Sequence, residues 1–153
     1  MNNAECIKGE LISKCLALVE QRIANAQQAM NAAQQSANEE GKSSAGDKYE
    51  TGRSMAQIER DKAAQQLNEA IILKNSLTKI RINSLADQVS LGSLVITDKN
   101  HFFIAISMGE IDAYGRDYFV VAPATPIGQL LMRLKVGNQF AFAKQIQTIK
   151  EIL

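Results

Sequence analysis

Acidic side chains gather in one glycine- and serine-containing stretch, EEGKSSAGDKYETG, at residues 39–52. Within it Asp47 and Glu50 form a D-x-x-E pair, and positions i and i+3 of a helix are neighbours on one face. Two such carboxylates can hold a hard cation such as Mg²⁺. The same pair suits a helix start, where Asp47 caps or offsets the helix dipole and Glu50 completes a capping box. Because this capping pattern is common, the sequence favours capping over metal binding.

Four further residues of this stretch are candidates for contact with a partner. Glu39 and Glu40 come from the preceding helix-forming sequence, and Lys42 adds a cation. Tyr49 is the only aromatic residue before Phe102. Its ring has two interpretations: it contacts a protein or nucleic-acid partner, as aromatic anchors do, or it covers an alanine-rich seam between two helices.

The remaining reactive side chains form no recognisable catalytic set. His101 is the single histidine and precedes a strand-like run, where a turn residue is the simplest interpretation. Cys6 and Cys15 stand nine residues apart in helix-forming sequence, without a C-x-x-C or Cys/His cluster that would indicate a metal site. The sequence also lacks a nucleophile–base set, a phosphate loop and a dinucleotide motif. We therefore expect no enzyme activity of its own, no intrinsic metal or cofactor, and two unpaired thiols in a reducing compartment.

The overall composition narrows the partners. The 153 residues carry 17 Lys and Arg against 16 Asp and Glu, so no global basic field favours direct nucleic-acid binding. No apolar run reaches the roughly 18–20 residues that span a bilayer. The polar start MNNAECIKGE differs from a signal peptide. These features predict a cytoplasmic protein without a membrane partner, and they leave the oligomeric state open.

Helix-forming sequence dominates the first half. Residues 5–80 contain no proline and are rich in strong helix formers. A heptad seam steps alternately by four and three residues along Val19, Ile23, Ala26, Met30, Ala33 and Ala37. A second seam follows at Ala56, Ala63, Leu67, Ala70 and Leu77. Two such stretches around a Gly/Ser break predict an antiparallel α-helical coiled-coil hairpin over 1–82, with its tip at about 39–52.

The second half predicts a different structure. After a connector at 83–90, residues 91–153 hold short runs rich in β-branched and aromatic residues, at 93–97, 101–107, 117–122, 138–143 and 146–152. TPIGQLLMRL predicts a short helix with Pro126 in its first turn, whose Leu130, Leu131 and Leu134 cover the core. The prediction is an α+β chain that ends in a small antiparallel sheet with one short helix.

At residues 122–142 the sequence APATPIGQLLMRLKVGNQFAF resembles the C-terminal domain of the bacterial Gre transcript-cleavage factors. That family has a Ser-Pro-(Ile/Leu)-(Ala/Gly)-x-x-Leu helix followed by a Val-Gly-Asp-like turn. The matching residues here are Thr125, Pro126, Ile127, Gly128, Leu131, Val136, Gly137 and Asn138. The resemblance implies an FK506-binding-protein-like domain behind a coiled-coil hairpin. It also implies a partner, bacterial RNA polymerase, which the globular domain contacts near the secondary channel. Arg133 and Lys135 are the docking candidates.

The resemblance assigns chemistry to the tip. Members of this family carry an Asp-x-x-Glu pair there, which helps hold the second Mg²⁺ of the polymerase active site. When Gly41 and Tyr49 are matched to that segment, Lys42 and Ala45 replace the two acids. A lysine would repel the ion. We therefore expect a Gre-like factor that modulates transcription without the usual cleavage acids.

Two alternatives stay open. In the first, Asp47 and Glu50 form a displaced pair that shares the polymerase Mg²⁺ and stimulates RNA cleavage. In the second, the chain is a structural or adaptor coiled-coil protein without a role at the polymerase.

Overall fold

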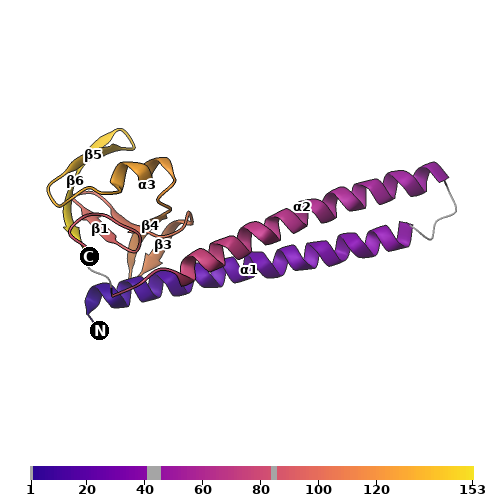
Figure 1. Cartoon of the computed structure of the whole chain (residues 1–153), viewed down its shortest axis with the longest axis horizontal. Coiled ribbons are helices and arrows are strands. Elements are labelled where there is room, and N and C mark those ends of the chain that lie inside the picture. Colours follow the sequence, from indigo (N-terminus) through magenta and orange to yellow (C-terminus); the bar gives the residue numbers. More distant parts are fainter. Residues whose placement is uncertain (1, 41–45, 84–85) are drawn as a thin grey trace. The chain divides into compact units, whose positions relative to one another are not determined.

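The computed structural model describes residues 2–40, 46–83 and 86–153, without the side chains of residues 40 and 46–51. The chain divides into two compact units (Figure 1). One combines Met1–Leu16 with Asn75–Leu153, and the other is Ala17–Lys74. The first turns of the first helix therefore belong to the same unit as the sheet, whereas the rest of the helical sequence forms a unit of its own.

Two long helices account for the first half of the chain. Helix α1 spans Asn3–Glu40 and α2 spans Gly46–Thr78. The described residues of the tip expected at 39–52 are all helical, since Glu39 and Glu40 end α1 and residues 46–52 begin α2. Helix α2 includes Gly52, although glycine in a helix costs about 1 kcal/mol relative to alanine. Residues 41–45 lie outside the described part of the chain.

A capping box starts α1. The Asn2 side-chain Oδ1 accepts a hydrogen bond from Glu5 N at 2.8 Å, and the Glu5 carboxylate accepts one from Asn2 N at 3.2 Å. Such reciprocal bonds satisfy two donors that a helix start otherwise leaves unpaired. The N-x-x-E spacing at residues 2–5 is a sequence signal that would have predicted this start.

The predicted heptad seam is confirmed in the helical unit. Five alanines of the seam are each at most 4% exposed: Ala26, Ala33, Ala56, Ala63 and Ala70. In Figure 1 the two helices run side by side, and a Lys74–Glu20 ion pair of 3.6 Å joins them within this unit. Each buried alanine removes little apolar area from water, so the seam is narrow and gains less stability per residue than a leucine seam.

The second half forms a six-stranded sheet. Its strands are β1 (Leu94–Thr97), β2 (His101–Ile104), β3 (Gly109–Ala113), β4 (Arg116–Val121), β5 (Gln139–Phe142) and β6 (Gln145–Ile152). They lie in the order β3-β4-β2-β1-β6-β5. The expected α+β class is confirmed, and the five predicted runs all contain strands.

The prediction of a purely antiparallel sheet was wrong. Strands β2 and β4 are parallel, with Phe102 opposite Phe119, so the sheet is mixed. The reason is β3, at residues 109–113, which is not among the five predicted runs. Strand β3 pairs with β4 along the edge of β4 opposite to β2, and the pairing is antiparallel. A two-residue turn at Tyr114 and Gly115, whose φ angles are +53° and +79°, connects the two strands. Glu and Asp are poor strand formers, which hid this strand from a propensity argument.

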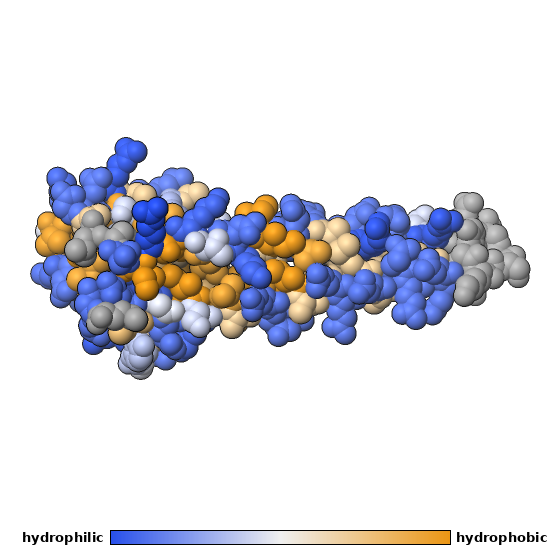
Figure 2. Space-filling model, turned by 60° about the horizontal axis from the view of Figure 1, so that its bottom comes forward, coloured by the Kyte–Doolittle hydropathy of each residue, from blue (hydrophilic) through white to orange (hydrophobic). Residues whose placement is uncertain are grey.

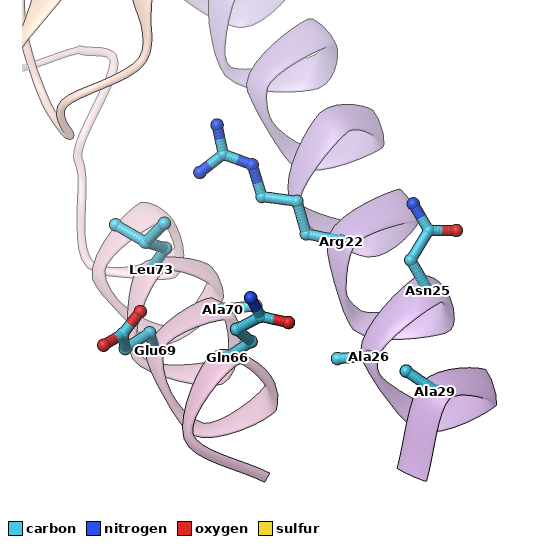
Figure 3. Close-up of a pocket in the computed structure, with 8 residues that line it drawn as sticks. All are labelled: Arg22, Asn25, Ala26, Ala29, Gln66, Glu69, Ala70 and Leu73. Carbon is cyan, nitrogen blue, oxygen red and sulfur yellow. The ribbon is translucent and has the colours of Figure 1, made fainter. Parts of the chain in front are cut away.

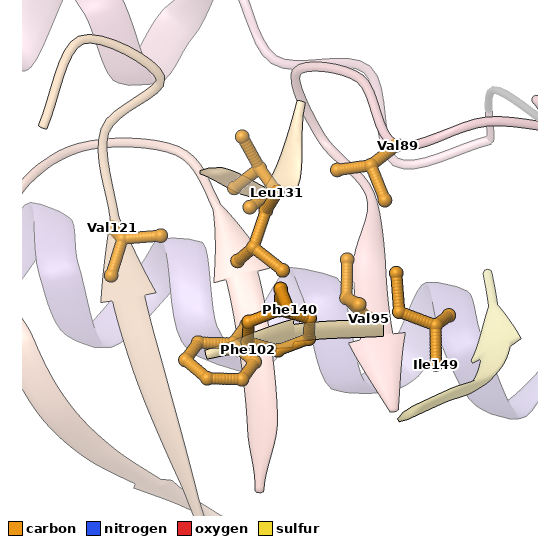
Figure 4. Close-up of a cluster of buried hydrophobic side chains, with 8 residues drawn as sticks. Val89, Val95, Phe102, Val121, Leu131, Phe140 and Ile149 are labelled. Atoms are coloured by element: carbon orange, nitrogen blue, oxygen red, sulfur yellow. The ribbon is translucent and has the colours of Figure 1, made fainter. Parts of the chain in front are cut away.

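One face of the sheet packs against the short helix α3 (Pro126–Leu131) and the β5 region. The buried cluster consists of Val89, Val95, Phe102, Ile104, Val121, Leu131, Phe140 and Ile149 (Figure 4). In the same unit the first turns of α1 are tied to β3, because the Lys14 ammonium donates to Asp112 O at 2.7 Å. Leu11 and Cys15 of α1 are fully buried.

Candidate partner-binding surfaces

The candidate tip residues lie where α1 ends and α2 begins. Glu39 is exposed in the last turn of α1. Glu40 is the last residue of α1, and Asp47, Tyr49 and Glu50 lie in the first turns of α2. The side chains of Glu40, Asp47, Tyr49 and Glu50, and all of Lys42, lie outside the described part of the chain, and so do the metal-binding and capping predictions for Asp47 and Glu50.

The second candidate surface is the helix and turn that carry the family resemblance. Thr125 caps α3: its Oγ1 accepts from Gly128 N at 3.2 Å and donates to Ala122 O at 2.7 Å. Pro126 stands at the first helical position, as predicted. Gly128 is required by packing, because a Cβ there would collide with Ala122 O and lie 2.9 Å from Pro123 O.

The docking candidates follow α3. Arg133 has a left-handed backbone with φ +70°, and its N–H donates to Val89 O at 2.9 Å. The Lys135 N–H donates to the Asn138 side chain at 2.8 Å. These bonds hold the backbone of the turn, so both cationic side chains are presented in the solvent from a defined position.

The three leucines of this segment have different environments. Leu131 is fully buried and Leu134 packs against the core, as predicted. The prediction that Leu130 also covers the core was wrong, because its side chain is 50% exposed. A six-residue helix buries one face, here Gly128 and Leu131 at spacing i, i+3, which leaves Leu130 pointing away. Val136 is 57% exposed on the following turn. The segment 130–136 therefore exposes apolar as well as cationic side chains.

A groove runs along one side of the helical unit. Its larger part, about 510 Å³, is lined by Arg22, Asn25, Ala26, Ala29, Gln66, Glu69, Ala70 and Leu73 (Figure 3). A second part of about 380 Å³ shares Ala29 and Gln66 with it and continues toward Ser36 and Glu59. The groove exists because alanines floor it, while longer polar side chains form its walls. On the right of Figure 2, the coloured surface of the two helices is mostly hydrophilic.

Two titratable side chains of the sheet unit are shielded from solvent, His101 in part and Cys15 fully. His101 packs edge-on against the Tyr118 ring at 5.4 Å, and its buried Nδ1 has no hydrogen-bond partner in the described part. Burial, helped by Arg116, lowers the pKa of His101. Burial also raises the pKa of the Cys15 thiol to about 11. A protonated thiol without a base beside it is a poor nucleophile.

Metal-binding clusters and membrane-spanning helices bear on the class of function. Among the side chains that the structure describes, no group of three or more His, Cys, Asp or Glu could hold a metal ion. Within ranges 2–40, 46–83 and 86–153, no helix has the length and apolar character needed to cross a membrane.

Comparisons with known proteins identify no family for this chain. No family model matches it, and no curated protein matches it. One similar solved structure is described as "Structure of the transcription factor Gfh1", with 16% sequence identity over 89% of this chain and 90% of that chain and a TM-score of 0.35. A TM-score this low does not establish a shared fold.

Proposed function

We propose that the chain is a divergent Gre-type transcription factor that binds bacterial RNA polymerase through its secondary channel and modulates transcription without supplying the usual cleavage acids. The proposal includes an FK506-binding-protein-like identity for the sheet unit. The observation that carries it is the combination, in one chain, of an alanine-seamed helical hairpin with the capped Thr125–Pro126 helix and its Val136–Gly137 turn.

The dimensions of the helical unit suit insertion into a channel. At 1.5 Å per residue, residues 17–40 of α1 extend about 36 Å and residues 46–74 of α2 about 44 Å within this unit. Two helices in contact measure roughly 20 Å by 10 Å in cross-section, because axes pack 8–10 Å apart. Because the seam residues are small, we expect the distance between the two helix axes to lie near the lower end of that range. Such a unit reaches deep into a narrow passage but cannot enclose a substrate.

The tip sequence favours modulation over cleavage. Lys42 and Ala45 occupy the positions at which the resemblance expects two carboxylates. Because α2 begins at Gly46, Asp47 belongs to its first turn, where a carboxylate is stabilised by the helix dipole. This start supports a helix-dipole role for Asp47, whereas a capping box with Glu50 would require Asp47 to precede the helix. The proposal holds that the free protein binds no metal or cofactor.

The docking surface of the proposal is the turn after α3. Arg133 and Lys135 supply cationic groups, and Leu130 and Val136 supply exposed apolar area beside them in the sequence. Interfaces commonly combine apolar anchors with arginine. The proposal assigns this surface to the polymerase and leaves contact with RNA and DNA to the polymerase itself.

Binding is tested by capturing purified polymerase with the full chain. The variant R133A/K135A should weaken binding at least tenfold, and K150A, which removes another exposed cation, should bind like the wild type. Failure of the wild-type chain to bind polymerase would contradict the proposal and favour the adaptor alternative, for which the groove along α1 and α2 offers a surface.

Cleavage is tested separately on a backtracked polymerase complex. The proposal expects no short 3′ RNA fragments above the background of polymerase alone. Fragments that appear with the wild type, disappear with D47N/E50Q and persist with the control E59Q would show that the displaced pair handles Mg²⁺. Binding without cleavage supports the modulating function.

A further inference from the structure

The walls of the groove along the helical unit carry charges without ionic partners. Within the described part of the chain, Arg22 and Lys62 take part in no ion pair. Glu69 accepts one hydrogen bond there, from Gln65 Nε2 at 3.3 Å. Ala29 lies exposed between these charged side chains (Figure 3). Charged walls beside exposed apolar area are typical of a surface that a protein partner covers.

The groove side of α1 has a symmetric order of residue types. Six residues follow one another there at steps of three and four: Arg22, Asn25, Ala29, Ala32, Ser36 and Glu39. This spacing places them on one face of the helix, and the first five line the groove. About a centre between residues 30 and 31, Ala29 mirrors Ala32, Asn25 mirrors Ser36, and the cation Arg22 mirrors the exposed acid Glu39.

The groove side of α2 is symmetric in the same way. Lys62, Gln66, Glu69 and Leu73 line the groove at steps of four, three and four. Ile58 precedes Lys62 by four residues on this face and is 67% exposed. About a centre between residues 65 and 66, Lys62 mirrors Glu69 and Ile58 mirrors Leu73. Each helix thus presents a charge opposite to that of its mirror position.

The two centres lie at the same height in the helical unit. Ala26 and Ala70 line the larger part of the groove together, and Ala33 and Ala63 line the smaller part. Counted from either alanine pair along the antiparallel helices, residues 30–31 of α1 face residues 65–66 of α2. One two-fold axis across the groove can therefore pass through both centres. A two-fold interface requires such a self-complementary surface.

We propose that the groove is the interface of a homodimer, in which two copies of the helical unit pack face to face, with their helices antiparallel about this axis. Lys62 of each copy pairs with Glu69 of the other copy. Arg22 pairs with Glu39 of the other copy in the same way. Ala29 packs against Ala32 of the other copy, which lets the two α1 helices approach closely. The exposed Ile58 is covered by Leu73 of the other copy.

The area of this face suits a stable dimer. Residues 17–40 of α1 belong to the helical unit and extend about 36 Å at 1.5 Å per residue. With a width of roughly 20 Å for two helices, the face covers about 700 Å² on each copy. The dimer would bury about 1,400 Å² in all, within the range of about 1,200–2,000 Å² that stable interfaces bury. Where the proposed function also holds, this broader dimer and the channel-bound monomer are alternative states.

Sedimentation equilibrium of the purified full chain should show a monomer–dimer equilibrium at about 10–100 µM. Lys62→Glu and Glu69→Lys each place two like-charged pairs in the interface, so each variant should weaken the dimer about tenfold. An equimolar mixture of the two variants should recover the affinity as a heterodimer, and so should the double variant. Lys150→Glu makes the same charge change as Lys62→Glu at an exposed site of the sheet unit and should dimerise like the wild type.

A wild-type chain that stays monomeric up to the highest concentration would overturn the proposal and leave the groove to a different protein. Single variants that dimerise like the wild type, or a mixture that recovers no affinity, would also overturn it. Circular dichroism checks that each variant keeps its helices. Polymerase takes no part in this experiment, so its outcome is separate from that of the proposed function.

Discussion

Thr125 Oγ1 and Gly128 N are joined by a hydrogen bond of 3.2 Å that closes the first turn of α3. The same hydroxyl donates to Ala122 O at 2.7 Å, so one side chain links the end of β4 to the start of the helix. The turn that follows presents Arg133 and Lys135, and its position depends on this cap. We expect this bond to help fix the proposed docking surface.

Thr125→Ala should destabilise the sheet unit by about 1 kcal/mol, the usual cost of losing a helix N-cap. Thr125→Ser should restore most of this loss because serine keeps the hydroxyl. Urea unfolding followed by circular dichroism measures both. Equal stability of the alanine variant and the wild type would show that the cap is dispensable.

Gly128→Ala should cost about 1–3 kcal/mol, because its Cβ would overlap backbone oxygens that cannot move aside. Gly9→Ala in α1 is the matched control, since nothing lies within 4 Å of a Cβ there. Gly9→Ala should stabilise the protein by up to about 1 kcal/mol through better helix propensity. The free energy of unfolding, measured with urea, should therefore fall for Gly128→Ala and rise for Gly9→Ala. A change in the same direction for both variants would contradict the role of Gly128 in packing.

His101 should make stability depend on pH in mildly acidic solution. Its folded-state pKa is lowered below the ordinary 6.5 by burial and by Arg116, while Glu151 acts in the opposite direction. The unfolded chain therefore binds the proton more readily. The stabilisation that neutral His101 contributes to the folded state is fully present above pH 6.5. It is lost as the pH falls through the lower pKa that His101 has in the folded state.

Urea midpoints measured across this range should rise with pH for the wild type, and the slope should decrease in His101→Gln. Substitution of an exposed acid, Glu110→Gln, controls for general acid effects. A wild-type slope that His101→Gln leaves unchanged would assign the dependence to other groups.

Cys15 should resist thiol reagents in the folded protein. It is fully buried and its pKa is raised to about 11, so the thiolate that reacts is scarce at pH 8. Cys6 is partly exposed and should react first. Counting modified thiols by mass spectrometry, with and without denaturant, tests this, and Cys6→Ser isolates the slow site. Rapid native labelling of Cys15 would contradict the burial of this side chain.

Local patterns were sufficient for several parts of this protein. The alanine and leucine heptads predicted the buried seam, because the period of a helix depends on near neighbours in sequence. Pro126 predicted the start of α3 for the same reason, since the groups that fix a helix start lie within a few residues of one another. The family resemblance and the altered tip residues Lys42 and Ala45 are also properties of the sequence alone.

The tertiary structure decided what depends on distant segments. The parallel pairing of β2 with β4, and the existence of β3, follow from which strands meet, and strand propensity carries no such information. Leu130 is exposed because the core reaches only one face of α3. Lys8 is 1% exposed, and Ile82, Asn83 and Leu153 line a small cavity beside it. No spacing within α1 reveals that cavity, since burial there results from residues more than seventy positions away.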